Sequence, residues 1–367
     1  MIKLRLSGQF EFESAPFVTK IVEQVTSDSD SLLKEIRGTT VFAEHPLGSF
    51  SFDLESIDEV YNDILICSPS NNKVQRLIRA NSRFNTLLIT ERCDQLCLMC
   101  SQPPRNTDDA WRFPLYKQAI KMAAPNSRII LSGGEPTLYK NDLFNLLLDV
   151  GKDRSDISFH ILTNGQHIND NDISTLLEIN ELIEVLWAIP LYSHDREMHE
   201  KIVDKKDSFD ALIENFFKFG KAKSNIELRT VVTQLNFFDL PHLAKFIAFN
   251  LGFINHWSIM AMENIGFAKA NINNLFVDYS SFFNPIGKAI DIATAANLAV
   301  RLFNFPLCSV PENYRKLCNK SISDWKNKYL DVCDACDEVQ NCCGFFEWYD
   351  DKVRLEAVGP IKTELNS

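Results

Sequence analysis

The chain has 367 residues, which is enough for one large α/β domain with additions, and its apolar (45%) and charged (24%) fractions are those of an ordinary soluble protein. Its formal net charge of −11 disfavours binding to nucleic-acid phosphates, although a protein with a negative net charge can still have a local basic cleft. Residues 1–30 lack the basic start and apolar core of a signal peptide, and no apolar run approaches the roughly 20 residues of a membrane span, so we expect a cytoplasmic protein.

Residues 1–82 form a region whose strand signals are stronger than its helix signals. Apolar and β-branched runs predict strands at 39–43, 63–67 and 73–79, with turn chemistry between the last two. Cys67 stands alone inside an apolar run, and we expect it to be a buried core thiol. The region therefore reads as a small β-rich unit, and two roles stay open for it, substrate recognition and a structural cap.

From residue 84 to about 262, strand and helix signals alternate along the chain. The predicted helices include 142–150 and 208–217, with Ser208 as the N-cap of the second. The predicted strands are 84–90, 127–132, 157–163, 182–190, 226–233 and 255–261. Strands that alternate with helices imply a parallel sheet, and chemistry in such folds sits at the carboxyl ends of the strands.

Ten cysteines are present, and nine of them fall into two groups, at 93–100 and 308–343. In a reducing compartment, clustered cysteines predict a metal site rather than disulfides. Cys93, Cys97 and Cys100 have the spacing C-x3-C-x2-C and follow the first strand of the alternating region. Three thiolates on one loop can ligate three irons of a four-iron cluster, which leaves one iron open to a substrate or cosubstrate. The alternative is a zinc loop, which favours paired C-x2-C units.

This spacing resembles the cluster loop of the radical S-adenosylmethionine (SAM) superfamily. The resemblance implies that the three cysteines hold a 4Fe-4S cluster whose open iron binds SAM. One electron would then cleave SAM to methionine and a 5′-deoxyadenosyl radical, so the three cysteines are the expected catalytic residues. It also implies a partial (β/α)6 barrel of the TIM type, which six strand–helix units suit.

Within this resemblance, motifs after the second, third and fourth strands are the expected SAM-binding residues. Gly133, Gly134, Glu135 and Pro136 match the motif that holds the SAM amino group. Asn164, in a Thr-Asn-Gly turn, corresponds to a position near the ribose, and Ser193 corresponds to a polar residue that touches SAM. Without the cysteine loop beside them, the Gly-Gly-Glu-Pro and Thr-Asn-Gly stretches would be read as ordinary βα turns.

Further positions in the second half of the barrel complete the expected SAM pocket. Arg229 lies in an otherwise apolar strand and matches the arginine that faces the SAM carboxylate, although a strand charge is usually solvated. Gly266 and Ala268 are the small residues expected beside the adenine. Met99 replaces the usual aromatic residue before the third cysteine, and a thioether can still cover an adenine face. His199 is expected to be structural.

The second cysteine group resembles the auxiliary-cluster region, of the SPASM or shorter twitch kind, in peptide-modifying radical SAM maturases. The resemblance implies that Cys308, Cys333, Cys336 and Cys342 ligate one auxiliary 4Fe-4S cluster without an open iron. The full SPASM pattern needs more cysteines, so Cys318 and Cys343 are spare or alternate ligands. A structural zinc ribbon is the alternative.

Stretches at 85–93, 97–104, 322–327 and 342–346 together resemble the His-Xaa-Ser system radical SAM maturases of the C type (HxsC). The resemblance implies a precursor peptide with His-Xaa-Ser repeats as substrate, an external one-electron reductant of the flavodoxin or ferredoxin type, and a partner maturase. We therefore expect a β-rich region at 1–82, a radical SAM barrel at 83–300 and an auxiliary-cluster region at 301–367.

Two other functions stay open from the sequence. A radical SAM enzyme could act on a small molecule or a nucleotide, although the C-terminal cysteines favour a peptide. A cysteine-rich scaffold with only structural metal is the second, and it would need neither Glu135 nor Arg229 at the cavity of the cysteine loop.

Overall fold

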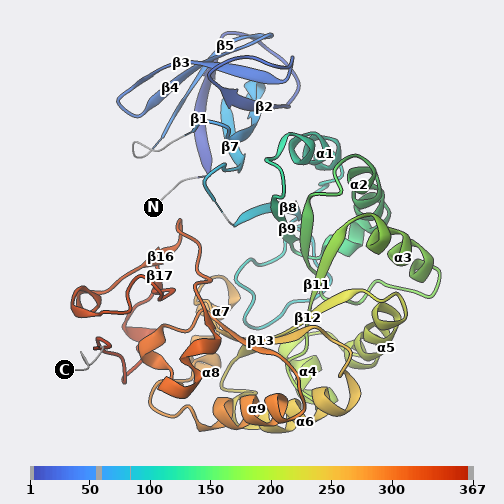
Figure 1. Cartoon of the computed structure of the whole chain (residues 1–367), viewed down its shortest axis with the longest axis vertical. Coiled ribbons are helices and arrows are strands. Elements are labelled where there is room, and N and C mark those ends of the chain that lie inside the picture. Colours follow the sequence, from blue (N-terminus) through green and yellow to red (C-terminus); the bar gives the residue numbers. More distant parts are fainter. Residues whose placement is uncertain (1–3, 55–59, 83, 363–367) are drawn as a thin grey trace. The chain divides into compact units, whose positions relative to one another are not determined.

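The computed structural model describes residues 4–54, 60–82 and 84–362 of the chain (Figure 1). Two compact units make up the chain. The first unit comprises Met1–Thr90, Thr107–Ile161 and Glu178–Val185, and the second comprises Glu91–Asn106, Leu162–Leu177 and Leu186–Ser367. The regions expected from the sequence also include residues 1–3, 55–59, 83 and 363–367, which lie outside the described residues. No described helix is long and apolar enough to cross a membrane.

A closed barrel of seven strands, drawn in blue in Figure 1, forms the start of the first unit. Its strands are β1 (Arg5–Phe10), β2 (Phe17–Val22), β3 (Asp30–Arg37), β4 (Thr40–His45), β5 (Gly48–Asp53), β6 (Ile64–Ser68) and β7 (Lys73–Ile78). Alternate residues along β1 and β4 point inward, as expected for strands with one face in a core. The expected β-rich character is confirmed, and β4, β6 and β7 are the three strands that the sequence predicted.

The barrel has an apolar core that contains the isolated cysteine. Cys67 is fully buried beside Ile21, Phe50 and Phe52, so its expected place in the core is confirmed. An ion pair is buried in the same barrel, where Arg76 donates from Nε to Oδ2 of Asp63 at 2.7 Å. The backbone N–H of Ala80 also donates to Asp63, at 2.8 Å, so the buried carboxylate has several partners.

A parallel sheet of eight strands, paired in chain order from β8 to β15, follows the barrel. The strands are β8 (Asn85–Thr90), β9 (Arg128–Gly133), β10 (Ser158–Leu162), β11 (Glu184–Pro190), β12 (Asn225–Val232), β13 (His256–Ala261), β14 (Val300–Phe303) and β15 (Cys318–Asn319). All six residues of β13 are buried, as is typical of a parallel strand covered on both faces. The expected α/β fold of the partial TIM type is confirmed, and β14 and β15 extend the six predicted strands by two.

The helices place their apolar residues on one face at intervals of three or four. In α5, Phe209, Leu212, Phe216 and Phe219 form this face. In the second unit α6 and α9 pack against each other (Figure 1). The helices are α1 (Arg112–Met122), α2 (Lys140–Asp153), α3 (Asp172–Leu182), α4 (Arg196–Val203), α5 (Ser208–Lys221), α6 (Leu240–Asn250), α7 (Phe267–Ala270), α8 (Ile272–Leu275) and α9 (Asn284–Ala295).

The predicted N-cap of α5 is wrong by one residue. The cap is Asp207, and Ser208 is the first residue of the helix. The Ser208 hydroxyl donates to the carbonyl of Lys205 at 2.8 Å, so it closes the preceding turn instead of accepting a helical N–H.

Candidate active site

The three cysteines of the C-x3-C-x2-C loop converge after the carboxyl end of β8. All three side chains are half-buried. Burial raises the pKa of Cys97, and the neighbouring Cys100 and Cys93 sulfurs raise it further, which shows that the three thiols lie close together. In the part of the chain that the structure describes, no group of three or more His, Cys, Asp or Glu side chains is placed to hold a single metal ion. Three soft thiolate donors on one loop fit an iron–sulfur cluster.

Backbone hydrogen bonds hold the cysteine loop against the end of α4. The N–H of Leu96 donates to the carbonyl of Val203 at 3.2 Å, and the N–H of Leu98 donates to that of Ile202 at 2.9 Å. From the other side, the side-chain amide of Asn271 donates to the carbonyl of Leu98 at 2.9 Å. These hydrogen bonds fix the shape of the cysteine loop from both sides.

Asp94, directly after the first cysteine, anchors the same loop through its carboxylate. It accepts a hydrogen bond from Asn164 Nδ2 at 2.8 Å, pairs with Lys205, and lies 3.2 Å from His167 Nε2. Burial alone would raise the pKa of Asp94, but His167, Lys205 and Asn164 outweigh it and hold the pKa well below its usual range. The sequence reasoning missed Asp94 and Lys205. For Asn164 the structure shows a partner in the loop, and its place near the ribose stays a prediction.

Met99 and Ala268, both expected beside the adenine, are brought together in one apolar cluster. Met99 is 7% exposed and Ala268 is fully buried, and Cys97, Tyr192 and Met262 pack against the same cluster. The thioether of Met99 thus lies in an apolar wall beside the cysteines, where a polarizable group can cover a flat ring.

Gly266 fits the loop after β13 closely onto the cysteine loop. Its φ of 59° and ψ of −131° belong to a region that only glycine adopts readily. A Cβ at this position would lie 2.6 Å from the carbonyl oxygens of Cys100 and Ser101. The next residue, Phe267, donates its N–H to the Cys100 carbonyl at 2.8 Å. A residue without a side chain is therefore required here, which is a packing reason for the glycine that was expected beside the adenine.

Replacing Gly266 with alanine is expected to lower the free energy of unfolding by about 1–3 kcal/mol, because the new Cβ meets two carbonyl oxygens and the backbone is strained. Urea unfolding measures this change. Gly252→Ala is the matched control, since a Cβ there meets only the Ala248 carbonyl at 3.5 Å. Equal stability of the two variants would contradict the close fit.

In the first unit, Gly133 and Gly134 close β9 against the end of β8. Gly133 has a φ of 144°, and a Cβ there would lie 2.2 Å from the carbonyl oxygen of Thr90. The N–H of Gly134 donates to the same oxygen at 2.8 Å. The two glycines are therefore needed for the close approach of the backbone at the end of these strands.

Glu135 follows the two glycines and is completely buried. Its carboxylate accepts hydrogen bonds from the N–H of Thr137, at 2.8 Å, and from the Thr137 hydroxyl. It thereby caps a short 3-10 helix, Pro136–Tyr139, in which Pro136 is the first residue. Binding of the SAM amino group by this motif stays a prediction.

Ser193 follows β11 and is 1% exposed. Its hydroxyl accepts the N–H of Asp195 at 3.1 Å and donates to Asp239 Oδ2 at 3.4 Å, so it shapes the start of α4. Contact with SAM stays a prediction for this residue.

His199 is buried in α4 between the rings of Tyr192 and Phe209. Its Nδ1 accepts the N–H of Tyr192 at 3.3 Å, and its Nε2 has no hydrogen-bond partner among the described residues. Burial lowers the pKa of His199 to about 4, so the ring is neutral at physiological pH. This packing agrees with the expected structural role.

Because the unfolded His199 ring has a pKa of 6.5 and the folded ring one of about 4, its contribution to stability is complete above pH 6.5 and is lost as the pH falls toward 4. Between pH 7.5 and pH 5 this loss amounts to about 2 kcal/mol in the wild type, and we expect it to be absent from His199→Phe. Urea unfolding at pH 7.5 and 5 measures the difference. The exposed His242, changed to Gln, is the control and should keep the wild-type pH dependence.

Arg229 lies on β12, and no carboxylate pairs with its guanidinium among the described residues. Its Nε and Nη2 atoms lie 3.2 and 3.0 Å from the sulfur of Met260. The electrostatic neighbours of the buried Tyr192 hydroxyl are Cys97, Arg229, Cys100 and Cys93. Arg229 and the three thiols therefore share one environment in the second unit, and the inward orientation favoured from the sequence fits this arrangement.

The C-terminal cysteines form a second site within the second unit. A cavity with about 340 Å³ of empty space is lined by Cys308, Cys333, Cys336 and Cys342, the four ligands expected from the sequence. Two short elements, β16 (Asn327–Lys328) and β17 (Phe345–Phe346), pair beside it. Four thiols around one cavity are the donor set of a four-iron cluster.

Backbone N–H groups already point at the sulfurs of this site. Leu307 and Gly344 donate to Cys342 Sγ at 3.3 and 3.4 Å, and Ile361 donates to Cys336 Sγ at 3.4 Å. Hydrogen bonds from Cys343 and from the N–H groups of Leu307 and Gly344 lower the pKa of Cys342 to about 6, which favours the thiolate that binds metal. Cys343 thus supports a neighbouring sulfur, and neither it nor Cys318 is among the residues described around the cavity.

A comparison with protein-family models gives a match over part of the chain. Residues 87–247 match the family model described as the Radical SAM superfamily. The search of curated proteins gives no match. Among solved structures, SuiB of Streptococcus suis bound to S-adenosylmethionine is similar, with 18% identity and a TM-score of 0.45, over 59% of this chain and 46% of that chain.

Two further solved structures show the range of similar proteins. Native anSMEcpe with bound AdoMet and Cp18Cys peptide has 16% identity and a TM-score of 0.42, over 59% of this chain and 62% of that chain. A radical SAM methyltransferase from Sphaerobacter thermophilus has 12% identity and a TM-score of 0.41, over 74% and 76%. The chain thus spans less than two thirds of SuiB and of anSMEcpe. The chain has an α/β fold with a parallel sheet of eight strands. Its residues 87–247, which carry the three-cysteine loop, match the Radical SAM superfamily.

Proposed function

We propose that this chain is a radical SAM enzyme that modifies a ribosomally synthesised peptide. The observation that carries the proposal is the convergence of Cys93, Cys97 and Cys100 on one loop at the start of the matched region. Cys93, Cys97 and Cys100 would hold a 4Fe-4S cluster, which would supply the electron for reductive cleavage of SAM and so the radical chemistry of the reaction. The protein contributes the binding of SAM, its orientation and the exclusion of water.

The residues around the loop suit the parts of SAM. Met99 and Ala268 offer an apolar wall for the adenine, and Gly266 lets the backbone approach closely. Arg229 has a guanidinium without a carboxylate partner among the described residues, and its fork fits the SAM carboxylate. We assign the SAM amino group to the motif of Gly133, Gly134, Glu135 and Pro136, with Asn164 and Ser193 as further candidates.

An auxiliary 4Fe-4S cluster in the C-terminal cavity is the second part of the proposal. Cys308, Cys333, Cys336 and Cys342 would hold it, because these four line one cavity and two of them accept backbone N–H bonds. Such bonds are typical of sulfurs that ligate iron and help to set its reduction potential. A zinc ribbon is the alternative, because the same thiolates can bind zinc.

For the substrate, we propose a precursor peptide with His-Xaa-Ser repeats, which the sequence resemblance and the C-terminal cysteine group support. The enzyme would also need an external one-electron reductant, of the flavodoxin or ferredoxin type, and a partner maturase. The β-rich region at 1–82, the barrel at 83–300 and the cluster region at 301–367 are the proposed domains, located in the cytoplasm. A small-molecule substrate is the second candidate, and the uncharged cavity described below gives it a possible site.

Anaerobic reconstitution with iron and sulfide, followed by dithionite and SAM, tests the reaction. Formation of 5′-deoxyadenosine and methionine is the expected result, and about eight irons per chain are expected for two clusters. If the iron-loaded protein formed no 5′-deoxyadenosine, the enzymatic proposal would be wrong. Co-expression with a neighbouring encoded peptide, followed by mass spectrometry, tests the peptide: a mass change that requires SAM cleavage supports it.

A further inference from the structure

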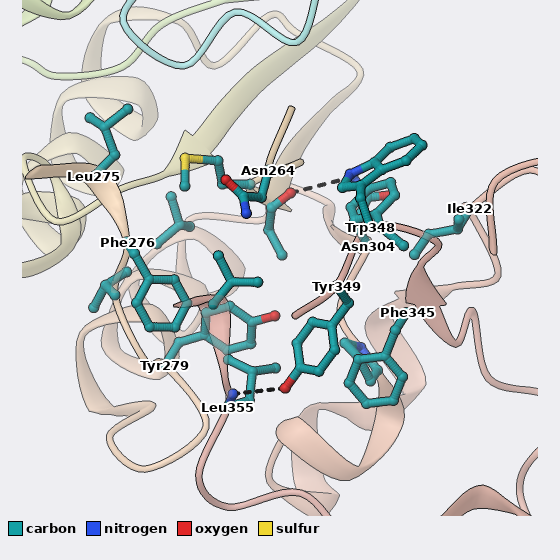
Figure 2. A pocket seen from close by; sticks show the side chains of 17 residues that line it. Asn264, Leu275, Phe276, Tyr279, Asn304, Ile322, Phe345, Trp348, Tyr349 and Leu355 are labelled. Atoms are coloured by element: carbon teal, nitrogen blue, oxygen red, sulfur yellow. Dashed lines mark hydrogen bonds between the residues drawn. The ribbon is translucent and has the colours of Figure 1, made fainter. Parts of the chain in front are cut away.

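A second cavity of the second unit lies at the carboxyl ends of β12, β13 and β14, and none of the expected SAM-binding or cluster-binding residues lines it (Figure 2). Val232 is the last residue of β12, Ala261 is the last of β13, and Asn304 directly follows β14. Residues from the segments 275–279 and 345–355 complete its wall, around about 560 Å³ of space that is partly open to solvent. This position, at the strand ends of a parallel sheet, is where such folds bind ligands.

The wall of this cavity is apolar, aromatic and without charge. None of the 17 side chains that line it is acidic or basic. Figure 2 shows the rings of Phe276, Tyr279, Tyr349 and Phe345 gathered around the space. A charged group would lose its water shell here without gaining a counter-ion, so the cavity excludes carboxylates, ammonium groups and phosphates.

Two polar atoms in this wall are buried and have no hydrogen-bond partner among the described residues. Asn264 is 5% exposed and its Oδ1 accepts no hydrogen bond, and the indole Nε1–H of Trp348 donates none within the described part of the chain. Other polar groups of the wall are paired: Asn304 Nδ2 donates to the carbonyl of Ala261 at 3.4 Å, and the Tyr349 hydroxyl accepts the N–H of Leu355 at 2.9 Å (Figure 2). An unpaired acceptor and an unpaired donor in one apolar wall complement an amide group, which offers one of each.

The cavity shares a wall with the proposed SAM pocket. Met262 lines the cavity and also packs in the cluster that contains Met99 and Cys97. The next residue, Glu263, is held by Lys326 Nζ at 3.1 Å. Lys326 in turn lies 5.3 Å from the ring centre of Phe346, another residue of the wall. The loop after β13 is therefore fixed between the two sites.

We propose that this cavity binds one uncharged, aromatic side chain of the peptide substrate together with its adjoining backbone amide. The proposal rests on the proposed function and adds the anchoring residue that the enzyme selects. Asn264 Oδ1 accepts the N–H of that amide, and Trp348 Nε1 donates to its carbonyl oxygen. The anchor lies beside the residue that is modified, because Met262 separates the two sites.

The probe for this proposal is N-acetyl-4-fluoro-phenylalaninamide, titrated into the reconstituted full chain and followed by the 19F linewidth of the probe. Saturable binding is expected. The charged analogue N-acetyl-4-fluoro-phenylalanine should bind at least about tenfold more weakly, because its carboxylate would be desolvated. Asn264→Leu and Trp348→Phe each remove one hydrogen bond and should weaken binding about fivefold to tenfold. Asn273→Leu, at an exposed position of α8, is the matched control and should bind the probe like the wild type.

Saturable binding that both variants weaken supports the proposal. Equal binding of the two probes, or unchanged binding in Asn264→Leu and Trp348→Phe with wild-type melting curves, overturns it. Formation of 5′-deoxyadenosine is measured on the same sample. SAM cleavage without probe binding rejects the anchor site and leaves the enzyme intact, whereas probe binding without SAM cleavage rejects the proposed reaction and keeps the site.

Discussion

Changing Cys97 to alanine is expected to remove about four irons per chain after anaerobic reconstitution and to reduce 5′-deoxyadenosine formation to the background of the iron-free chain. Cys97 is the middle cysteine of the loop, and the sulfurs of Cys93 and Cys100 act on it electrostatically. With only two thiolates left on the loop, a four-iron cluster loses a ligand that nothing nearby replaces, since the next cysteine along the chain is Cys308. Iron content, the visible absorption of the cluster and chromatography of the SAM products measure the effect.

Cys67→Ala is the matched control for this prediction. Cys67 is a fully buried thiol in the core of the N-terminal barrel, and it belongs to neither cysteine group. Its variant should retain all iron and all SAM cleavage. If Cys97→Ala kept eight irons and full activity, the assignment of the loop to a cluster would be wrong.

The strands of the parallel sheet could be predicted from the sequence because they are nearly continuous apolar runs. Each of the six predicted strands agrees with one of β8 to β13 within two residues at either end. Four strands of the N-terminal barrel were missed, and β1 shows why. Its two buried positions are Leu6 and Gly8, so only one of them carries an apolar side chain and the alternation that marks a strand cannot be read in the sequence. The strands β14 and β15 have four and two residues, which is too short for any periodicity.

In the candidate active site, the spacing of the cysteines identified the sulfur donors, but it could not identify the residues that hold the cysteine loop in place. The cysteine loop was visible because its residues are neighbours in sequence. Asp94 and Lys205 are 111 residues apart, and nothing in one sequence pairs them. The unpaired polar atoms of Asn264 and Trp348 were likewise invisible, because the absence of a partner is a property of the folded chain.

The largest effect expected outside the first site comes from Cys333→Ala. Cys333 lines the C-terminal cavity with Cys308, Cys336 and Cys342, so its loss should reduce the iron content from about eight to about four per chain. Because a bound cluster ties together short elements with little core of their own, the variant should also melt at a lower temperature than the reconstituted wild type. The three-cysteine loop is left intact, and SAM cleavage without peptide should persist while peptide modification falls.

Cys318→Ala is the matched control, because it tests whether any C-terminal cysteine or only a ligand of the cluster is needed for the second set of irons. Cys318 lies in β15 and is not among the residues described around the cavity, so its variant should keep about eight irons. If Cys318→Ala lost four irons and Cys333→Ala lost none, Cys318 would be a ligand of the cluster and Cys333 would not. A reconstituted wild type that holds one zinc ion and only four irons would replace the auxiliary cluster with a zinc site, because the same four thiolates can serve either metal. Metal analysis of the three proteins side by side therefore decides both the ligand set and the metal.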